Sequence, residues 1–278
     1  MKGKITVLCD NLVIGRTDTI GEHGFSLFIE SEEGNYLFDT GRSFSVVHNS
    51  IYYRKDLSSI KKIFLSHGHL DHTGGLPSVL QLIQKKIEVV AHPHIFLNRF
   101  RIKNKERVYN GIPFTKGYLE RLGARFTLNK EWFQITDNIF LTGEIPRKTS
   151  FEEGDFSQRY GIVDGRTVPD LIMDDQSLVI TTDEGLLVIL GCCHSGLINT
   201  LKYIIEKSGV EKIHSIIGGT HLGFLPEKQT EKTIEALKDF QIKKICPSHC
   251  TGMEVSIKLY EEFRDNFVLC GVGKVLEF

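Results

Sequence analysis

Three histidines and an aspartate stand within six residues of one another in the segment Ser66–Gly75, as His67, His69, Asp71 and His72. Imidazole nitrogens and carboxylate oxygens are ligands that suit zinc, iron and manganese. His67 and His69 alternate along the chain, so their rings can project to the same side, while Asp71 and His72 can face a second point close by. The segment therefore predicts a metal centre for one or two divalent ions.

The elements on either side of this segment determine where it lies. It follows an apolar run with the character of a strand, Ile63–Leu65, and it precedes helical spacing from Leu76 to Lys86. In α/β folds, ligand-binding and catalytic residues lie in loops at the carboxyl ends of strands. Strand patterns dominate the first 65 residues, and strands alternate with helices in the second half of the chain. This order predicts an α/β sandwich with helices on the outside.

The composition is that of a globular protein, with 278 residues of which 41% are hydrophobic and 25% charged. The formal net charge is −1, which argues against a protein that coats nucleic acid or an acidic membrane surface. No apolar run approaches the ~18–20 residues that a membrane span needs. The six cysteines include the adjacent pair Cys192 and Cys193, which suits no disulfide framework and is typical of a reducing compartment. We therefore expect a cytoplasmic protein with no membrane or nucleic-acid partner.

A basic segment interrupts the pattern of strands and helices at about residues 98–126. Between residues 99 and 125 it carries eight Lys or Arg against two Glu. Such an excess beside a metal site predicts a small anionic substrate that is steered by the local field. Arg147, further along the chain, could make a bidentate contact with a phosphate group. The alternative is a solvated helical cap whose basic side chains lie over apolar surface.

The motif His67–His72 resembles the HxHxDH signature of the metallo-β-lactamase superfamily. Two further segments are similar to motifs of that superfamily, Phe38–Gly41 near the start and Ser248–Gly252 after a late strand. The resemblance covers nearly the whole chain. It implies a single domain, residues 1–278, folded as a four-layer αββα sandwich with a metal site between its two sheets, and the basic segment then reads as an inserted cap.

Other segments narrow the resemblance to one subfamily. They are Gly21–Ser26, Leu141–Arg147, Asp174–Leu178, Gly191–Gly196, Gly218–Leu222 and His249–Gly252. The subfamily includes an archaeal synthase that joins a dihydropterin to a ribofuranosyl-aminobenzene phosphate, alongside many bacterial proteins described as metal-dependent hydrolases. The resemblance thus implies metal-dependent chemistry on a small molecule but leaves the substrate open.

One departure from the superfamily pattern concerns the metal ligands. Common dinuclear members carry a histidine at the third motif and a bridging aspartate at the fourth, and here Cys192 stands where that aspartate would fall. His194 follows two residues later, and we take it as the replacement ligand, with Glu144 and Asp175 as weaker candidates. Cys192 and Cys193 are either soft ligands or small buried thiols that pack under the site.

The resemblance then implies two sets of ligands. One ion would be held by His67, His69 and His194, and the other by Asp71, His72 and His249. Zinc is the favoured ion, with manganese, iron or magnesium as alternatives. Without a bridging carboxylate the second ion would be held more weakly, and Asp39 is expected to hydrogen-bond the histidine loop.

Two residues are candidates for a direct role in catalysis or substrate binding. The carboxylate of Asp71 could hold or deprotonate a metal-activated water. His221 stands in a glycine-rich turn after a strand, where it could donate a proton or bind the substrate, unless it is a turn histidine in contact with solvent only.

Three functions remain open from the sequence. The first is a metal-dependent hydrolase that attacks a phosphorylated or other anionic small molecule with a metal-activated water. The second, implied by the subfamily, is transfer of a dihydropterin-methyl group with release of diphosphate. The third is a non-catalytic module that binds a metal and a ligand.

Overall fold

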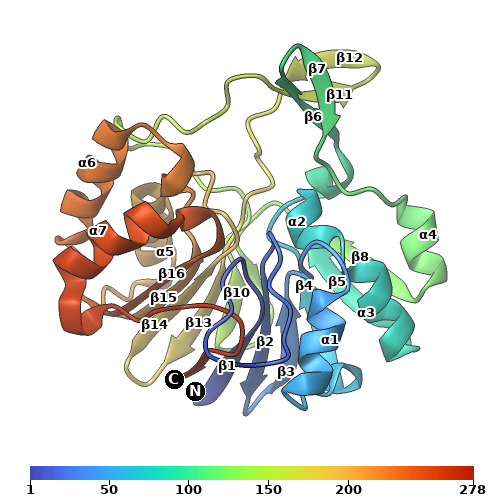
Figure 1. The fold of residues 1–278 in the computed structure, drawn as a ribbon, viewed down its shortest axis with the longest axis horizontal. Coiled ribbons are helices and arrows are strands. Elements are labelled where there is room, and N and C mark those ends of the chain that lie inside the picture. Colours follow the sequence, from blue (N-terminus) through green and yellow to red (C-terminus); the bar gives the residue numbers. More distant parts are fainter.

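The structure is a computed structural model that describes all residues, 1–278, and it has two large sheets packed face to face (Figure 1). The first sheet has seven strands in the order β17-β1-β2-β3-β4-β5-β8. Its strands are β1 (Gly3–Cys9), β2 (Ser26–Ser31), β3 (Gly34–Phe38), β4 (Ile60–Phe64), β5 (Ile87–Ala91), β8 (Ala124–Leu128) and β17 (Val275–Glu277). Strands β3, β4, β5 and β8 run parallel to one another, so their carboxyl ends meet at one edge.

The second sheet has six strands in the order β16-β15-β14-β13-β10-β9. Its strands are β9 (Phe133–Gln134), β10 (Ile139–Leu141), β13 (Leu178–Thr182), β14 (Gly185–Leu190), β15 (Ile213–Gly219) and β16 (Ile242–Ser248). Strands β14, β15 and β16 are parallel neighbours. Every residue of β14 and β15 is buried, as expected for strands covered on both faces.

Helices cover the outer face of each sheet (Figure 1). Those on the side of the first sheet are α1 (Ser45–Tyr52), α2 (Leu70–Thr73), α3 (Leu76–Ile83) and α4 (Lys116–Arg121). Those on the side of the second sheet are α5 (Leu197–Ser208), α6 (Glu227–Leu237) and α7 (Met253–Phe263). Helix α5 buries Leu197, Leu201 and Ile204 on one face and ends at Gly209, whose positive φ closes the last turn.

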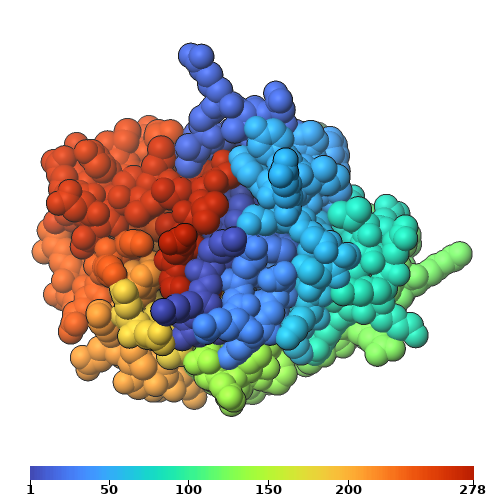
Figure 2. Space-filling view, turned by 90° about the horizontal axis from the view of Figure 1, so that it is seen from below, coloured from blue at the N-terminus to red at the C-terminus, as the bar shows by residue number.

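Three apolar clusters hold these layers together. One lies between the two sheets and includes Phe25, Phe38 and Ile189. The other two lie between each sheet and its own helices. Figure 2 looks at the end where both termini lie, and there the N-terminal and C-terminal halves of the chain pack against each other along a continuous boundary. The predicted four-layer α/β sandwich is confirmed.

A third, small sheet lies at the opposite end from the termini (Figure 1). It has four strands in the order β12-β11-β6-β7. Its strands are β6 (Asn98–Lys103), β7 (Glu106–Tyr109), β11 (Arg159–Val163) and β12 (Arg166–Pro169). The sequence did not indicate this sheet, because it joins two hairpins that are far apart in the chain.

The basic segment 98–126 therefore divides between two parts of the fold. Its first residues form the hairpin β6–β7 of the small sheet, whereas α4 packs beside the first large sheet and β8 is the edge strand of that sheet. The expected boundary near residue 126 falls inside β8. None of the helices combines the length and the apolar character that crossing a membrane requires.

Candidate metal centre and substrate cavity

The candidate site is built from loops that leave the carboxyl ends of neighbouring strands. His67 follows β4 in the first sheet. Cys192, His221 and His249 follow β14, β15 and β16, the three parallel neighbours of the second sheet. Because the carboxyl ends of parallel strands lie at one edge, the loops of the two facing sheets converge at the same place.

Asp39 fixes the histidine loop, as predicted from the sequence. Its Oδ1 accepts a hydrogen bond from the Ser66 backbone N–H at 2.7 Å, and its Oδ2 accepts one from the Ser66 hydroxyl at 2.7 Å. Oδ2 also lies 2.7 Å from Nδ1 of His72. This contact leaves Nε2 of His72 directed at the site, which is how a carboxylate commonly orients a metal-binding imidazole.

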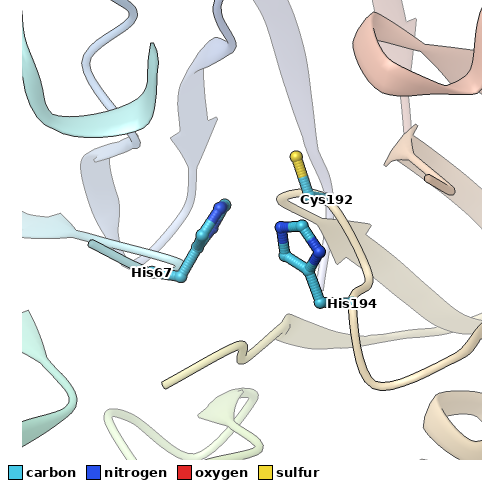
Figure 3. A group of neighbouring side chains, drawn as sticks. All are labelled: His67, Cys192 and His194. Carbon is cyan, nitrogen blue, oxygen red and sulfur yellow. The ribbon is translucent and has the colours of Figure 1, made fainter. Parts of the chain in front are cut away.

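The structure brings together the three residues predicted for the first ion. The ring centroids of His67 and His69 are 4.5 Å apart, and that of His194 lies 4.9 Å from His67 and 5.0 Å from His69. All three side chains are buried. Figure 3 shows the rings of His67 and His194 facing each other from the two halves of the fold, with the sulfur of Cys192 beside them.

The residues predicted for the second ion also meet. Oδ2 of Asp71 lies 3.3 Å from Nε2 of His249 and 3.9 Å from Nε2 of His72. His23 places its Nε2 at 3.2 Å from the same oxygen. Burial alone would raise the pKa of Asp71, but hydrogen bonds with His23 and His249 outweigh it and hold that pKa well below its ordinary value.

The donor atoms of these residues fit a divalent cation. Nε2 of His69 and both ring nitrogens of His194 are buried without a hydrogen-bond partner. Buried polar atoms are otherwise almost always paired, because an unpaired one costs ~1–3 kcal/mol. Burial also lowers the pKa of His67, His69 and His194, which favours the neutral imidazoles that a metal ion requires.

Glu144 and Asp175, the weaker ligand candidates, have other partners. Oε1 of Glu144 lies 3.1 Å from Nε2 of His92, on the loop after β5. Oδ2 of Asp175 accepts a hydrogen bond from the Ser195 backbone N–H at 2.9 Å. Asp175 thereby holds the loop that carries His194, and neither carboxylate belongs to a group of converging ligand atoms.

His221 is part of a chain of charged contacts that the sequence did not reveal. Its Nε2 lies 3.2 Å from Oδ1 of Asp155, whose Oδ2 pairs with Nη2 of Arg159 at 2.6 Å. Burial disfavours a charge on His221, yet Asp155 raises the pKa of this imidazole to about 9. The ring of His221 lies 4.2 Å from that of His194, so a protonated imidazole stands beside the candidate metal ligands.

A cavity of about 250 Å³ opens over these residues. His69, Asp71, His194 and His221 line its floor, together with Cys192 and Cys250. The small sheet and the segment before it supply further lining residues, which are Arg101, Val108, Tyr109, Asn110, Asp155 and Arg159. His23, Arg42, Leu70 and Phe224 complete the lining.

The structure does not bring Arg147 to this cavity. Its Nη2 donates to the backbone carbonyl of Leu171 at 2.5 Å, and its guanidinium lies 4.5 Å from the ring centroid of Phe156. These contacts fix the side chain away from the candidate metal ligands. The arginines that do reach the cavity are Arg42, Arg101 and Arg159, of which the sequence indicated only Arg101, through the charge of its segment.

Comparisons with known proteins agree with this fold. Residues 19–198 match the family described as the metallo-beta-lactamase superfamily. The chain is 34% identical over 283 residues to the 7,8-dihydropterin-6-methyl-4-(beta-D-ribofuranosyl)-aminobenzene-5'-phosphate synthase of Methanocaldococcus jannaschii, covering 99% of this chain and 96% of that protein. An uncharacterized protein of the same organism is 32% identical over 273 residues, covering 98% and 99%.

Among solved structures, a metal-dependent hydrolase of the beta-lactamase superfamily is similar over 99% of both chains, with a TM-score of 0.83 and 28% sequence identity. The family match spans more than half of the chain, and the synthase is similar over almost all of it. The chain therefore belongs to the metallo-β-lactamase superfamily.

Proposed function

We propose that the chain is a metal-dependent hydrolase of a phosphorylated or otherwise anionic small molecule. The observation that carries this proposal is the composition of the cavity, which joins unpaired imidazole nitrogens on its floor to arginines on its walls. Metal ligands beside arginines suit a substrate whose negative charge must be bound and neutralised where it reacts.

The ligands in this proposal are the two sets predicted from the sequence. His67, His69 and His194 hold one ion, and Asp71, His72 and His249 hold the other. When bound, a divalent ion makes water more acidic and polarises a phosphoryl oxygen. Asp71 then orients the attacking water through its carboxylate, and the protonated His221 donates to the leaving group. The six free cysteines fit a reducing compartment, and we place the protein in the cytoplasm.

The proposal of an anionic substrate is supported by two arginines that lie opposite each other on paired strands. Arg101 on β6 and Arg159 on β11 are directly paired across the small sheet, and both line the cavity. Like charges opposite each other on paired strands repel. Arg159 is compensated by Asp155, whereas Arg101 makes no ion pair within the chain. A bound anion would relieve this repulsion.

Replacing Arg101 by glutamine should therefore lower kcat/KM for a phosphodiester about 10- to 100-fold, since a charged hydrogen bond is worth ~1.5–3 kcal/mol. The dependence of kcat/KM on ionic strength should also flatten. Steady-state kinetics at several salt concentrations measure both effects. Lys103→Gln is the matched control, because it removes the same charge from the same strand outside the cavity lining. Equal losses in the two variants would contradict the role of Arg101.

A second candidate, transfer of a dihydropterin-methyl group with release of diphosphate, is supported by the 34% identity to the archaeal synthase. The volume of the cavity supports the hydrolase instead. At about 250 Å³ it lies below the ~300–1,000 Å³ of pockets that enclose drug-sized ligands. It suits one phosphoryl group with a small substituent better than two ring systems that are to be joined.

The two candidates are separated by their products. We expect the protein loaded with zinc or manganese to release nitrophenol from methyl p-nitrophenyl phosphate, a phosphodiester with a single ring. Consumption of a dihydropterin-methyl diphosphate only when an arylamine is present, without phosphodiester cleavage, would replace the hydrolase by the transferase. If neither reaction occurs while inorganic phosphate raises the melting temperature, the protein is a binding module and the proposed activity is refuted.

A further inference from the structure

His23 reaches the candidate metal centre from the loop between β1 and β2, which carries none of the candidate ligands. Its side chain is half-exposed and lines the cavity. Its Nε2 lies 3.2 Å from Oδ2 of Asp71, the oxygen that also lies 3.3 Å from Nε2 of His249. The ligand atoms of these three residues lie within 4.8 Å of one another. His23 is therefore either a further metal ligand or a hydrogen-bond donor to Asp71.

The backbone holds His23 at this place. Gly24 follows it, and a Cβ there would stand 2.8 Å from the carbonyl oxygen of Asp71, so glycine allows the two loops to approach this closely. The Phe25 backbone N–H donates to the same carbonyl at 3.2 Å. The loop that carries His23 is thus attached through its main chain to the loop that carries Asp71.

Asn11, in the loop after β1, contacts the rings of both His23 and His249. Its Oδ1 lies 2.9 Å from Nδ1 of His249, and its Nδ2 lies 3.2 Å from Nδ1 of His23. Backbone groups determine the orientation of this amide, because Oδ1 accepts from the Gly24 N–H at 3.3 Å and Nδ2 donates to the His249 carbonyl at 3.5 Å. The amide therefore presents an acceptor to the ring of His249 and a donor to the ring of His23.

This amide assigns opposite tautomers to the two rings. Nδ1 of His249 carries a proton that it donates to Asn11, which leaves Nε2 as the nitrogen that an ion can bind. Nδ1 of His23 accepts from Asn11, so the neutral ring of His23 carries its proton on Nε2. That N–H is directed at the carboxylate of Asp71. The nitrogen of His23 that faces the site therefore has no free lone pair for an ion.

We propose that His23 is a positioning residue that acts through Asp71 and that Asn11 sets its tautomer. The proposal rests on the proposed function, in which Asp71 orients the attacking water, and it deepens that function. A hydrogen bond from Nε2 of His23 to Oδ2 fixes the direction of this carboxylate, as outer partners commonly do for metal ligands. His23 thus adds to the centre a donor rather than a ligand.

Long-range ¹H–¹⁵N NMR spectra of the zinc-loaded protein test the tautomers, because they distinguish a protonated ring nitrogen from a bare one. We expect the proton of His23 on Nε2 and that of His249 on Nδ1. His48 is the internal reference, since its Nε2 lies 2.8 Å from the backbone carbonyl of Asp18, which can only accept. Asn11→Asp, which replaces the amide donor by an acceptor, should move the proton of His23 to Nδ1 and leave that of His249 in place.

Substitution of His23 tests the consequence for Asp71. At saturating zinc, His23→Ala should keep the wild-type number of ions but lower kcat for methyl p-nitrophenyl phosphate ~10- to 100-fold with little change in KM, the range typical of outer partners of metal ligands. His23→Gln keeps an N–H donor near the place of Nε2 and should restore most of this loss, whereas a purely structural role would not separate the two variants. His48→Gln, at an exposed histidine outside the cavity lining, is the matched control and should behave as the wild type.

Three results would overturn the proposal. The first is a wild-type spectrum in which Nδ1 of His23 is protonated, because Asn11 would then not set the tautomer. The second is the loss of an ion in His23→Ala, which would make His23 a ligand. The third is a kcat of His23→Ala equal to that of the wild type. If the wild type cleaves no phosphodiester, the proposed function fails, but the tautomers and the metal content still decide the role of His23.

Discussion

Replacing His194 by alanine should remove at least one metal ion per chain and lower turnover by roughly 100-fold or more. His194 is the only member of its set that comes from the second half of the fold, and both of its ring nitrogens are buried and unpaired. Residues that merely support a ligand already change metal affinity or activity ~10- to 100-fold, so loss of a ligand itself should exceed that range. Elemental analysis after dialysis against a weak chelator measures the first effect.

His92→Ala provides the control for this prediction. His92 is equally buried and also follows a strand, but its Nε2 pairs with Glu144 rather than facing the other histidines. Its removal should destabilise the protein without changing the number of bound ions. If His194→Ala retains its full metal content, the ligand set derived from the sequence is incorrect, and the loss of ions in His92→Ala would refute the location of the centre.

The histidine loop could be predicted because its information is local. The motif His67–His72 follows an apolar strand, and strand ends gather functional loops in any α/β sheet. His194 and His249 came from the resemblance to the later motifs of the superfamily, and each follows a strand of the second half. The structure then brings all of them together, which spacing along the chain alone does not guarantee.

The walls of the cavity could not be predicted, because they depend on contacts between segments far apart in the sequence. Arg147 was expected to bind phosphate, but its guanidinium donates a hydrogen bond to the backbone carbonyl of Leu171. Asp155 and Arg159 carry no recognisable spacing, and they reach the cavity because β11 pairs with β6. A count of charges in one segment cannot show which of its side chains find partners elsewhere.

Arg99 is the clearest case of such a distant partner. The sequence counted it among the charges of the basic segment 98–126, yet its side chain is only 1% exposed. Its Nη2 contacts both carboxylate oxygens of Asp174, at 2.9 and 3.0 Å, and its Nε lies 3.5 Å from Oδ2 of Asp170. Oδ2 of Asp174 in turn accepts a hydrogen bond from the Gly68 backbone N–H at 2.7 Å, between the metal ligands His67 and His69.

Replacing Arg99 by leucine should therefore lower the free energy of unfolding by ~3–5 kcal/mol, because it leaves two buried carboxylates without their cation. For a chain of this size the loss corresponds to a fall of roughly 10 °C in the melting temperature. Urea denaturation of the metal-free protein measures the change. Lys103→Leu, an exposed position on the same strand, should shift the stability by less than ~0.5 kcal/mol.

A second substitution distinguishes the charge of Asp174 from its hydrogen bond to the histidine loop. Asp174→Asn removes the charge but keeps an oxygen that can accept from Gly68, so the double variant Arg99→Leu/Asp174→Asn should regain part of the lost stability and bind metal normally. If Arg99→Leu costs less than ~1 kcal/mol, or if the double variant is less stable than the single one, Arg99 does not act by compensating Asp174. Since Asp174 is bonded to the backbone between two candidate ligands, the ion pair joins the small sheet to the metal centre. Arg99→Leu alone should therefore lower metal affinity as well as stability, whereas the double variant keeps a neutral acceptor for the Gly68 N–H and with it the metal affinity.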